Sequence, residues 1–419
     1  MDDFLRPRPK KRPTPQKETI IKPETGDTDK TVAEIPLAEP PKADTVEEVS
    51  TSTQSDKVKK KFWRKRHPIG WFKSLQKKQK ALVVLAVLLL FGGGVAGAWY
   101  LLKPKPQPKP VAKVVAPKPV APKPETEPSR LTGVQVKPEL NQRPVTAIMI
   151  ENSPDARPQS GLKEAGVVFE AIAEGGITRF LALFQEAQPA NIGPVRSVRP
   201  YYVDWLHGFD AAVAHVGGSS DGLAKIKADG IKDLDQFANP KPYHRISSRY
   251  APHNMYTSMA GLDELSKSKG FTSSKFDGFP RKDEKKLDTP TVTSMDFNIS
   301  GYLYNPHYDY DATTNVYKRS EGGKPHIDAE SGDQLAPKVV IVVVIPYGIA
   351  ANGVNSQYGN IGTGKAIVFQ DGGKTEGTWS KSSGSDQIKF NDANGQPIKL
   401  NPGQTWISVV GSADRVSYK

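Results

Sequence analysis

The chain contains no cysteine among its 419 residues. This excludes disulfide bonds, thiolate metal sites, a cysteine nucleophile and a lipid-modified cysteine within this sequence. The phosphate-binding motif G-x-x-x-x-G-K-[ST] and the zinc-protease motif H-E-x-x-H are also missing. We therefore expect no bound cofactor and no metal centre.

The folded part of the chain has no excess of charge. The net charge is +13, but from Leu131 onward 31 lysines and arginines balance 31 aspartates and glutamates. A nucleic-acid-binding surface needs a local surplus of basic residues in the folded domain. The whole excess lies in the first 130 residues, so we expect no nucleic acid as a partner.

The N-terminal third predicts a tail, an anchor and a spacer. Residues 1–80 are predicted to form a basic, disordered tail, of which residues 1–56 have almost no aromatic residues. Residues 81–102 are uncharged and long enough for a single transmembrane helix, although a cleaved signal peptide is the alternative. Eleven lysines and arginines precede this run from 57 to 80, which places the tail in the cytosol and the remainder outside the cytoplasmic membrane. Residues 103–130 form a linker rich in proline and lysine.

The remaining sequence predicts two folded domains. Residues 131–280 alternate strand-like and helix-like patterns, which favours an α/β or mixed α+β domain. Strands are expected over 145–151, 165–176 and 177–185, and Gly175-Gly176 suits a hairpin between the last two. Helices are expected over 197–209, 221–230 and 258–270. After the polar stretch 271–290, residues 291–419 show short strands and turns, which predicts a smaller β-rich domain.

Several stretches occur in the order found in one known family. They are "RPVTAIMIENSPDARPQSGLKEAGVVFEAIAEGGITRFLALF", "GPVRSVRPYYVDW", "AAVAHVGGS" and "APHNMYTS", followed by "YDYDATTNVYKRSEGGKPHIDAESGDQL" and "LNPGQTWISVV". From about Thr132 to the C-terminus, this sequence resembles the YerB-like lipoproteins, a bacterial family of unknown function with paired N- and C-terminal halves. The resemblance implies a place on the outer face of the cytoplasmic membrane. Here the predicted membrane helix takes the role of the lipid anchor.

The stretch "GPVRSVRP" carries the main candidate site. With Ser197 as N-cap of the helix over 197–209, Arg199 lies at the positive end of the helix and Arg196 just outside it. Arg179, in "GGITRF", adds a third cation if its strand ends nearby. Phosphate or carboxylate groups suit such a cluster. In the alternative, Glu170 and Glu174, expected to point the same way from one strand, pair with these arginines and only fix the fold.

The stretch "HVGGSSDG" offers a second candidate. Gly217, Gly218 and Ser219 form a glycine turn between a strand and a helix, and such turns hold anions. Ser220 also fits a G-x-S-x-G nucleophile elbow with histidines downstream. His215 precedes the turn as a ligand-binding candidate or a buried structural histidine.

Two further stretches hold polar candidates. In "APHNMYTS", His253 and Asn254 could orient a substrate, or Asn254 could simply begin a turn. In "KPHID", His326 and Asp328 share one strand face, but no third ligand follows at metal-site spacing.

Three functions are compatible with these residues. The first is a binding module that holds an anionic cell-wall polymer or lipid-linked glycan through Arg179, Arg196 and Arg199. The second is an envelope hydrolase or transferase acting on a phosphodiester, pyrophosphate or glycan bond, with His253 or Glu170 moving the proton. The third is a scaffold without catalytic activity. An enzyme requires a proton-transfer group beside the arginines, whereas a scaffold leaves Arg196 and Arg199 fully paired with internal acids.

Overall fold

The structure is a computed structural model that describes residues 76–88 and 125–419. The chain divides into two compact units, Met1–Val114 and Val115–Lys419. In the first unit, residues 77–88 are helical. No helix within the two described ranges has the length and apolar character needed to cross a membrane. Most of the predicted span 81–102, like the predicted linker up to 124, lies outside the described residues.

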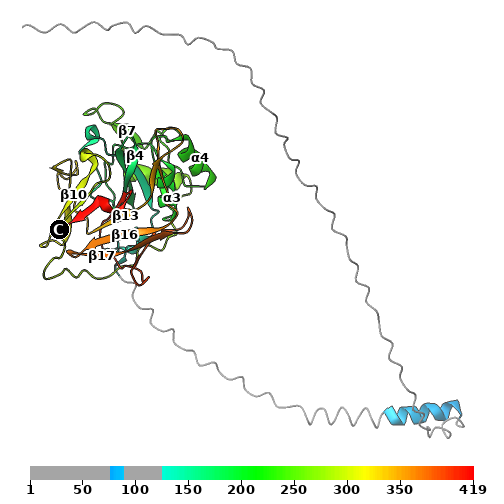
Figure 1. The fold of residues 1–419 in the computed structure, drawn as a ribbon. Coiled ribbons are helices and arrows are strands. Elements are labelled where there is room, and N and C mark those ends of the chain that lie inside the picture. The colour runs from blue at the N-terminus through cyan, green and yellow to red at the C-terminus, as the bar shows by residue number, and fades with distance from the viewer. Residues whose placement is uncertain (1–75, 89–124) are drawn as a thin grey trace, which may run out of the picture. The chain divides into compact units, whose positions relative to one another are not determined.

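The second unit is built on a nine-stranded sheet (Figure 1). Its strand order is β18-β17-β16-β13-β19-β4-β5-β3-β6. In the same order, these strands are Lys389–Asp392, Gly373–Lys381, Gly362–Gln370, Val339–Val344, Thr405–Val410, Val167–Glu174, Ile177–Phe184, Thr146–Glu151 and Ala212–Ala214.

A second sheet of five strands has the order β12-β11-β10-β9-β20, with bounds Lys324–Pro325, Val316–Glu321, Pro306–Asp311, Ser294–Phe297 and Val416–Tyr418. Three small hairpins complete the β-structure described here. They are β1 (Glu127–Pro128) with β2 (Gln135–Val136), β7 (Tyr243–Arg245) with β8 (Met255–Thr257), and β14 (Tyr347–Ile349) with β15 (Ser356–Tyr358).

The helices are α2 (Pro138–Asn141), α3 (Pro200–His207), α4 (Ser220–Ala228) and α5 (Met259–Ser268). Single turns of 3₁₀-helix are η2 (Pro154–Ala156), η3 (Tyr302–Tyr304) and η4 (Ala413–Arg415). The helices expected over 221–230 and 258–270 are present as α4 and α5. Each is capped by the serine before it, Ser219 or Ser258, whose side chain accepts from a backbone N–H in the first turn.

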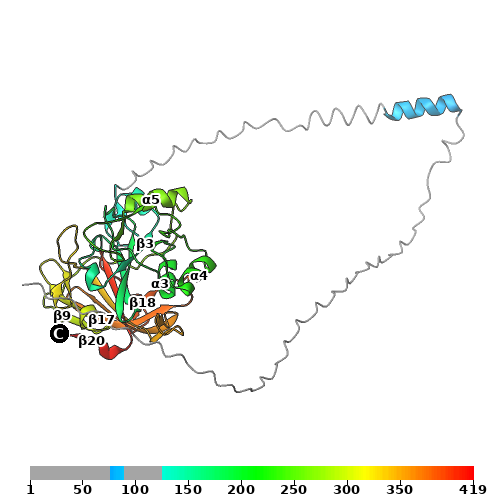
Figure 2. The same ribbon diagram turned by 90° about the horizontal axis from the view of Figure 1, so that it is seen from above.

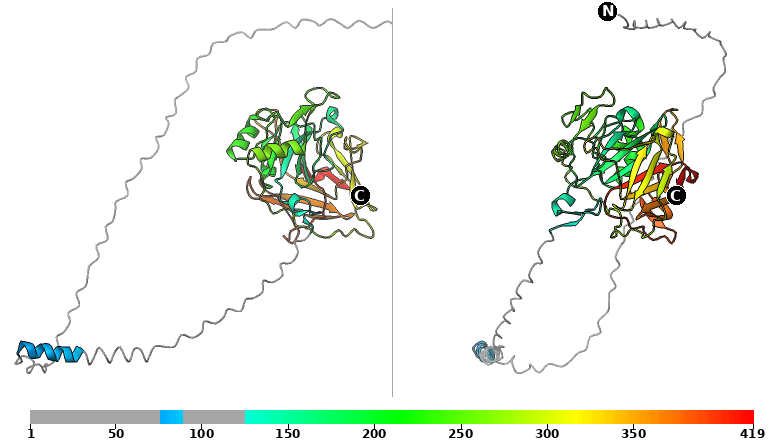
Figure 3. Two further views of the ribbon diagram at one scale, coloured as in Figure 1. Left: turned by 180° about the vertical axis from the view of Figure 1, so that it is seen from behind. Right: turned by 90° about the vertical axis from the view of Figure 1, so that its left-hand side faces the viewer.

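The large sheet separates two hydrophobic cores. On one face α3 packs through Tyr202 and Trp205 against Phe169 of β4. On the other face the small sheet and α5 cover Phe180 and Trp406. Figures 1, 2 and 3 show α3 and α4 on one side of the large sheet and the small sheet on the other. The alternation of side chains along each strand therefore fills two cores at once.

The two halves expected as separate domains share this sheet. The mixed α/β character of the N-terminal half and the β-rich character of the C-terminal half agree with the sequence. However, β19 pairs in parallel with β4, which places a C-terminal strand beside an N-terminal one. The stretch 271–290 also packs on the first core through the buried ring of Phe279. Both halves thus contribute to each hydrophobic core.

Candidate functional site

Five strands of the large sheet end at one edge. β13, β19, β4, β3 and β6 run in the same direction, while β5 between β4 and β3 is antiparallel to them. In open α/β sheets, ligands bind outside the carboxyl ends of the parallel strands. The predicted arginines lie at this carboxyl edge: Arg179 is near the start of β5, and Arg196 and Arg199 precede α3.

The prediction that Ser197 caps the helix is wrong. Val198 forms a parallel bridge to Gly218, so the chain is extended there, and α3 begins at Pro200. The Oγ of Ser197 donates instead to the carbonyl of Val216 at 3.0 Å. Because Val198 pairs with Gly218, this segment is extended and does not form the first turn of the helix.

Glu174, at the end of β4, holds two of the three arginines. Its Oε1 accepts from Nη2 of Arg179 at 2.7 Å, and its Oε2 accepts from Nη2 of Arg199 at 2.5 Å. The other terminal nitrogens donate to backbone carbonyls, of Ser197 for Arg179 and of Val198 for Arg199, both at 2.7 Å. Burial opposes ionisation of Glu174, but the two guanidinium groups pull its pKa below the ordinary value. Arg179 and Arg199 are therefore engaged by internal acceptors.

Arg196 is only partly engaged. Its Nε lies 3.3 Å from Oε2 of Glu151, without hydrogen-bond geometry, and its side chain is 24% exposed. Within the described residues, this ion pair is the one side-chain contact recorded for its guanidinium group. Burial and the two neighbouring arginines lower the pKa of Arg196, while Glu151 acts against this. The other oxygen of Glu151 accepts from Ser153 at 2.9 Å and lies 3.0 Å from Nδ1 of His253.

These groups form one charged cluster, which we call the carboxyl-edge cluster: Glu151, Glu174, Arg179, Arg196, Arg199 and His253. Three arginines face two carboxylates, so the cluster has a net charge of +1 when His253 is neutral. By charge count the surplus belongs to Arg179 and Arg199, which share Glu174, while Arg196 has the fewest hydrogen-bond partners of the three.

Glu170 does not belong to this cluster, because a β-bulge separates it from Glu174. The pairing of β4 with β5 shifts between Ile172 and Glu174. A one-residue shift turns the following side chains to the opposite face of a sheet. Glu174 therefore reaches the arginines beside α3, whereas Glu170 points into the core beneath the small sheet. The expectation that both point the same way is wrong.

Glu170 instead joins a buried ion network that the sequence analysis missed. Its Oε1 accepts from Nη2 of Arg319 at 2.7 Å, and its Oε2 accepts from Nε1 of Trp406 at 2.9 Å. Arg319 also donates to Oε1 of Glu321 at 3.1 Å and to Nδ1 of His326 at 2.9 Å. Glu170 and Arg319 have no exposed surface, so Glu170 is not placed to exchange protons with a substrate. The signal lay in "VYKRSE", where Arg319 and Glu321 share the inward face of β11 with a buried tyrosine.

This network predicts a pH-dependent stability. Burial raises the pKa of Glu321 from 4.5 to about 7, although Arg319 opposes the shift. The folded state then holds a proton that the unfolded state releases above about pH 4.5, so stability falls as pH rises from about 4.5 to 7. We expect Glu321→Gln, which cannot ionise, to gain up to roughly 3 kcal/mol relative to the unchanged chain across that range. Urea unfolding of both proteins at a series of pH values measures this difference.

The neighbouring His326 works in the opposite direction. Burial and nearby Arg319 hold the pKa of His326 well below the ordinary value. As pH drops, the unfolded histidine therefore gains a proton that the folded one does not, and stability falls. This contribution is present in both proteins and cancels in their difference. Glu264→Gln, at an exposed carboxylate, serves as the control and should show a constant difference. A constant difference for Glu321→Gln would contradict the prediction.

The glycine turn already holds an internal carboxylate. Gly217 has a φ of +61°, and its N–H donates to Oδ1 of Asp235 at 3.2 Å. Gly218 pairs with the segment before α3, and Ser219 caps α4. Ser220 is the first residue of α4, and no hydrogen bond joins it to a histidine in the described part of the chain. The turn therefore binds an anion, as glycine turns do, but that anion comes from the chain itself.

The remaining candidates have structural contacts. Both ring nitrogens of the buried His215 are used, by the carbonyl of Gly217 at 2.8 Å and by Asp233 at 3.0 Å. Asn254 accepts from Arg245 at 2.6 Å and donates to two carbonyls of its own loop, which agrees with the turn interpretation. In the described ranges, no three histidine or acidic side chains are grouped to hold a metal ion. His326 belongs to the buried network rather than to a pair with Asp328.

The fold and the site together define a class: an α/β protein whose N-terminal half is completed by strands of a β-rich C-terminal half. Two family models match these halves. Residues 131–272 match "Protein of unknown function (DUF3048) N-terminal domain", and residues 295–407 match the DUF3048 C-terminal domain. The chain belongs to the DUF3048 family.

Comparison with individual proteins agrees with this. "Putative lipoprotein YerB" of Bacillus subtilis (strain 168) is 32% identical over 293 residues, which cover 68% of this chain and 87% of that protein. The crystal structure of YerB from Bacillus subtilis has a TM-score of 0.64 and 28% identity, and covers 70% of this chain and 99% of that one. The predicted membership of the YerB-like family, with its paired halves, is thus confirmed.

Proposed function

We propose that this chain is an extracytoplasmic binding protein, anchored in the cytoplasmic membrane by residues 81–102, that holds an anionic component of the cell envelope at its carboxyl-edge cluster. The similarity to the protein named "Putative lipoprotein YerB" supports a place at the membrane surface. The uncharged run 81–102 supports a helical anchor in place of a lipid. The ligand carries phosphate or carboxylate groups.

The unequal pairing of Arg196 is the observation that carries the proposal. Glu174 neutralises one charge for Arg179 and Arg199 together, and Glu151 lies beside Arg196 without a hydrogen bond from its Nε. A half-buried guanidinium group binds an anion more strongly than an exposed one, because less water screens the attraction. A ligand anion at Arg196 would also meet the net positive charge of the whole cluster.

Two substitutions with opposite expected effects test the proposal. Arg196→Gln should weaken binding of phosphate-bearing cell-wall fragments by the full chain by about tenfold or more, because a charge-assisted hydrogen bond is lost. Glu151→Gln removes the acid that competes with the ligand and should strengthen binding. Arg179 and Arg199 are left intact, because their loss would leave Glu174 unpaired. Calorimetric titration and the shift in melting temperature both measure the effect.

Lys241→Gln, at an exposed lysine paired with Glu264, is the matched control and should leave binding unchanged. No binding of the fragments by the unchanged chain, or equal binding by all four proteins, would contradict the proposal and favour the scaffold function. A loss of binding in both cluster variants would indicate that the cluster only maintains the fold.

The enzymatic alternative is supported by one contact. Nδ1 of His253 lies 3.0 Å from Glu151, which is the way a carboxylate orients a catalytic histidine. The Oγ of Ser153 lies 3.2 Å from the same Nδ1, whereas in a serine triad the nucleophilic hydroxyl is hydrogen-bonded to Nε2 of the histidine. The geometry thus favours His253 as a general acid or base rather than as part of a triad. Release of products from the fragments during the same titration distinguishes turnover from binding.

A further inference from the structure

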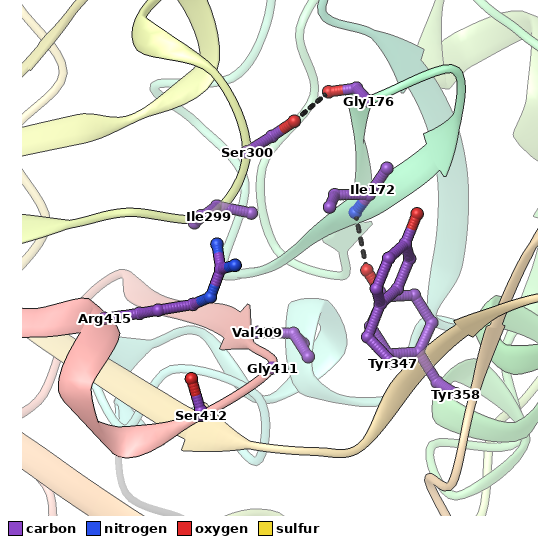
Figure 4. Close-up of a pocket in the computed structure, with 10 residues that line it drawn as sticks. All are labelled: Ile172, Gly176, Ile299, Ser300, Tyr347, Tyr358, Val409, Gly411, Ser412 and Arg415. Atoms are coloured by element: carbon purple, nitrogen blue, oxygen red, sulfur yellow. Dashed lines mark hydrogen bonds between the residues drawn. The ribbon is translucent and has the colours of Figure 1, made fainter.

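A separate cavity of about 440 Å³ opens at the carboxyl ends of β4 and β19 (Figure 4). Its walls come from both halves of the chain. Ile172 and Gly176 belong to the hairpin of β4 and β5, whereas Val409, Gly411 and Arg415 follow from β19 into η4. None of the carboxyl-edge cluster lines it. Its position is nevertheless the one at which open parallel sheets bind ligands.

One wall of the cavity is aromatic and rigid at its base. The hydroxyl of Tyr358 accepts from the backbone N–H of Ile172 at 2.9 Å, and this ring is almost fully buried. Tyr347 lies against it, with ring centroids 5.3 Å apart, and remains 39% exposed. No hydrogen bond is recorded for the hydroxyl of Tyr347 within the described residues. The cavity therefore presents an exposed aromatic ring on a fixed support.

The opposite wall carries Arg415, an exposed cation that interacts electrostatically with its sequence neighbour Asp414, although Asp414 does not line the cavity. Nη1 of Arg415 donates to the carbonyl of Asn298 at 3.1 Å, and no carboxylate of the described chain forms an ion pair with this guanidinium group. Figure 4 shows the group pointing into the cavity beside Ile299. No acidic residue lines the cavity among those described. The cavity is thus positively charged, unlike the regions where Arg179, Arg199 and Arg319 have carboxylate partners.

The hairpin tip at one wall of the cavity packs closely on the C-terminal half. Gly176 has a φ of +78°, and a Cβ there would lie 3.0 Å from Oγ of Ser300. Ser300 donates to the carbonyl of Gly176 at 2.7 Å, which ties the N-terminal hairpin to the C-terminal half. The cavity wall is therefore a fixed contact between the halves rather than a loose loop.

We propose that this cavity binds a sugar residue that bears one carboxylate or phosphate group. The C–H face of the sugar ring packs on Tyr347, because the face of an aromatic ring is negatively polarised. The acidic group of the sugar pairs with Arg415. The volume accommodates one or two such rings within the range of small-molecule sites. This second site stands on observations independent of the carboxyl-edge cluster and extends the proposed function.

The test titrates the full chain with five probes: glucuronate, glucose 6-phosphate, glucose, inorganic phosphate and adenosine monophosphate. We expect the two acidic sugars to bind at least about tenfold more tightly than glucose or phosphate, because only they engage both walls. Equal binding of glucose and glucuronate would overturn the role of Arg415. Tighter binding of adenosine monophosphate than of either acidic sugar would overturn the assignment to sugars.

Substitutions at each wall separate the two contacts. Arg415→Gln should weaken both acidic sugars about tenfold while leaving glucose unchanged, and Tyr347→Ala should weaken all three sugars while leaving phosphate unchanged. Tyr347→Phe keeps the ring and should retain binding. Tyr302→Ala and Arg130→Gln, at exposed residues outside the cavity, are matched controls. Unchanged binding in Arg415→Gln and Tyr347→Ala would overturn the proposal.

The Arg196→Gln variant distinguishes this inference from the proposed function. Because Arg196 does not line the cavity, its substitution should leave the binding of glucuronate unchanged. Loss of sugar binding in Arg196→Gln would place the sugar at the carboxyl-edge cluster and overturn the second site.

Discussion

Residues 125–290, produced without the C-terminal half, should show no cooperative thermal unfolding. In the intact chain β4 is a central strand, paired with β5 on one side and β19 on the other. Removing residues 291–419 turns β4 into an exposed apolar edge and uncovers Phe180. It also leaves the buried carboxylate of Glu170 without Arg319. Unpaired apolar edges favour aggregation, and an unpaired buried charge is strongly destabilising.

Circular dichroism during heating measures this for each half, with residues 125–419 as the positive control. Residues 291–419 alone should likewise fail to unfold cooperatively, because β13 and β19 lose the cover of the N-terminal strands. Co-expression of the two pieces should restore a folded complex, since the contacts between them do not require a continuous chain. A cooperative transition in either isolated half, at the temperature of the intact unit, would contradict the prediction.

The local elements of this unit were predictable from the sequence because their signals are local. Gly175 and Gly176 both have positive φ, as the expected hairpin between β4 and β5 requires. The serine caps and apolar spacing of α4 and α5 place these helices to within two residues of the expected bounds. Each of these signals lies within about a dozen residues of the structure that it specifies.

The pairing of β4 with β19 was not predictable in this way, because more than two hundred residues separate the two strands in the chain. Composition divides the chain into an α/β and a β-rich part, but it carries no information on which strands pair. The same limit applies at Ser197, where the local signal for a helix start is overridden by a bridge between Val198 and Gly218.

The arginines of the candidate site were predictable, but their acidic partners were not all predicted, because Glu151 was missed. Arg179, Arg196 and Arg199 do lie together at the carboxyl edge. Their acidic partners are Glu174 and Glu151 rather than Glu170, because the bulge after Ile172 changes the face on which the last residues of β4 project. Strict alternation of side chains along β4 would place Glu170 and Glu174 on the same face. The bulge changes this alternation without a signal in the sequence, so the sequence alone assigns Glu174 to the wrong face.

Arg319→Met should destabilise the folded unit by about 3–5 kcal/mol. The guanidinium group of Arg319 is fully buried, with Nη2 bonded to both Glu170 and Glu321, and its carbon lies 4.5 Å from the ring centroid of Trp406. Methionine fills much of the volume but leaves Glu170 in an apolar core with no opposite charge at bonding distance, and leaves Glu321 with Arg157 alone, at 3.3 Å. The cost is therefore the desolvation of the remaining acids rather than the loss of packing. Urea unfolding at neutral pH measures it.

Lys318→Met is the matched control on the same strand. Lys318 faces outward from β11, is about half exposed and pairs with Asp311 at 2.8 Å. Loss of such a surface pair costs at most about 1 kcal/mol. Stability of Arg319→Met within that limit would contradict the prediction.

The triple variant Arg319→Met, Glu170→Gln, Glu321→Gln should recover most of the lost stability. It removes both acids that bonded to Arg319 and keeps groups that accept the hydrogen bonds of Trp406 and Asn152. Recovery would show that the two acids, and not the shape of the core, determine the cost. Because Glu170 and Trp406 come from neighbouring strands of different halves, the same result would show that the halves stay joined without the charges of this network.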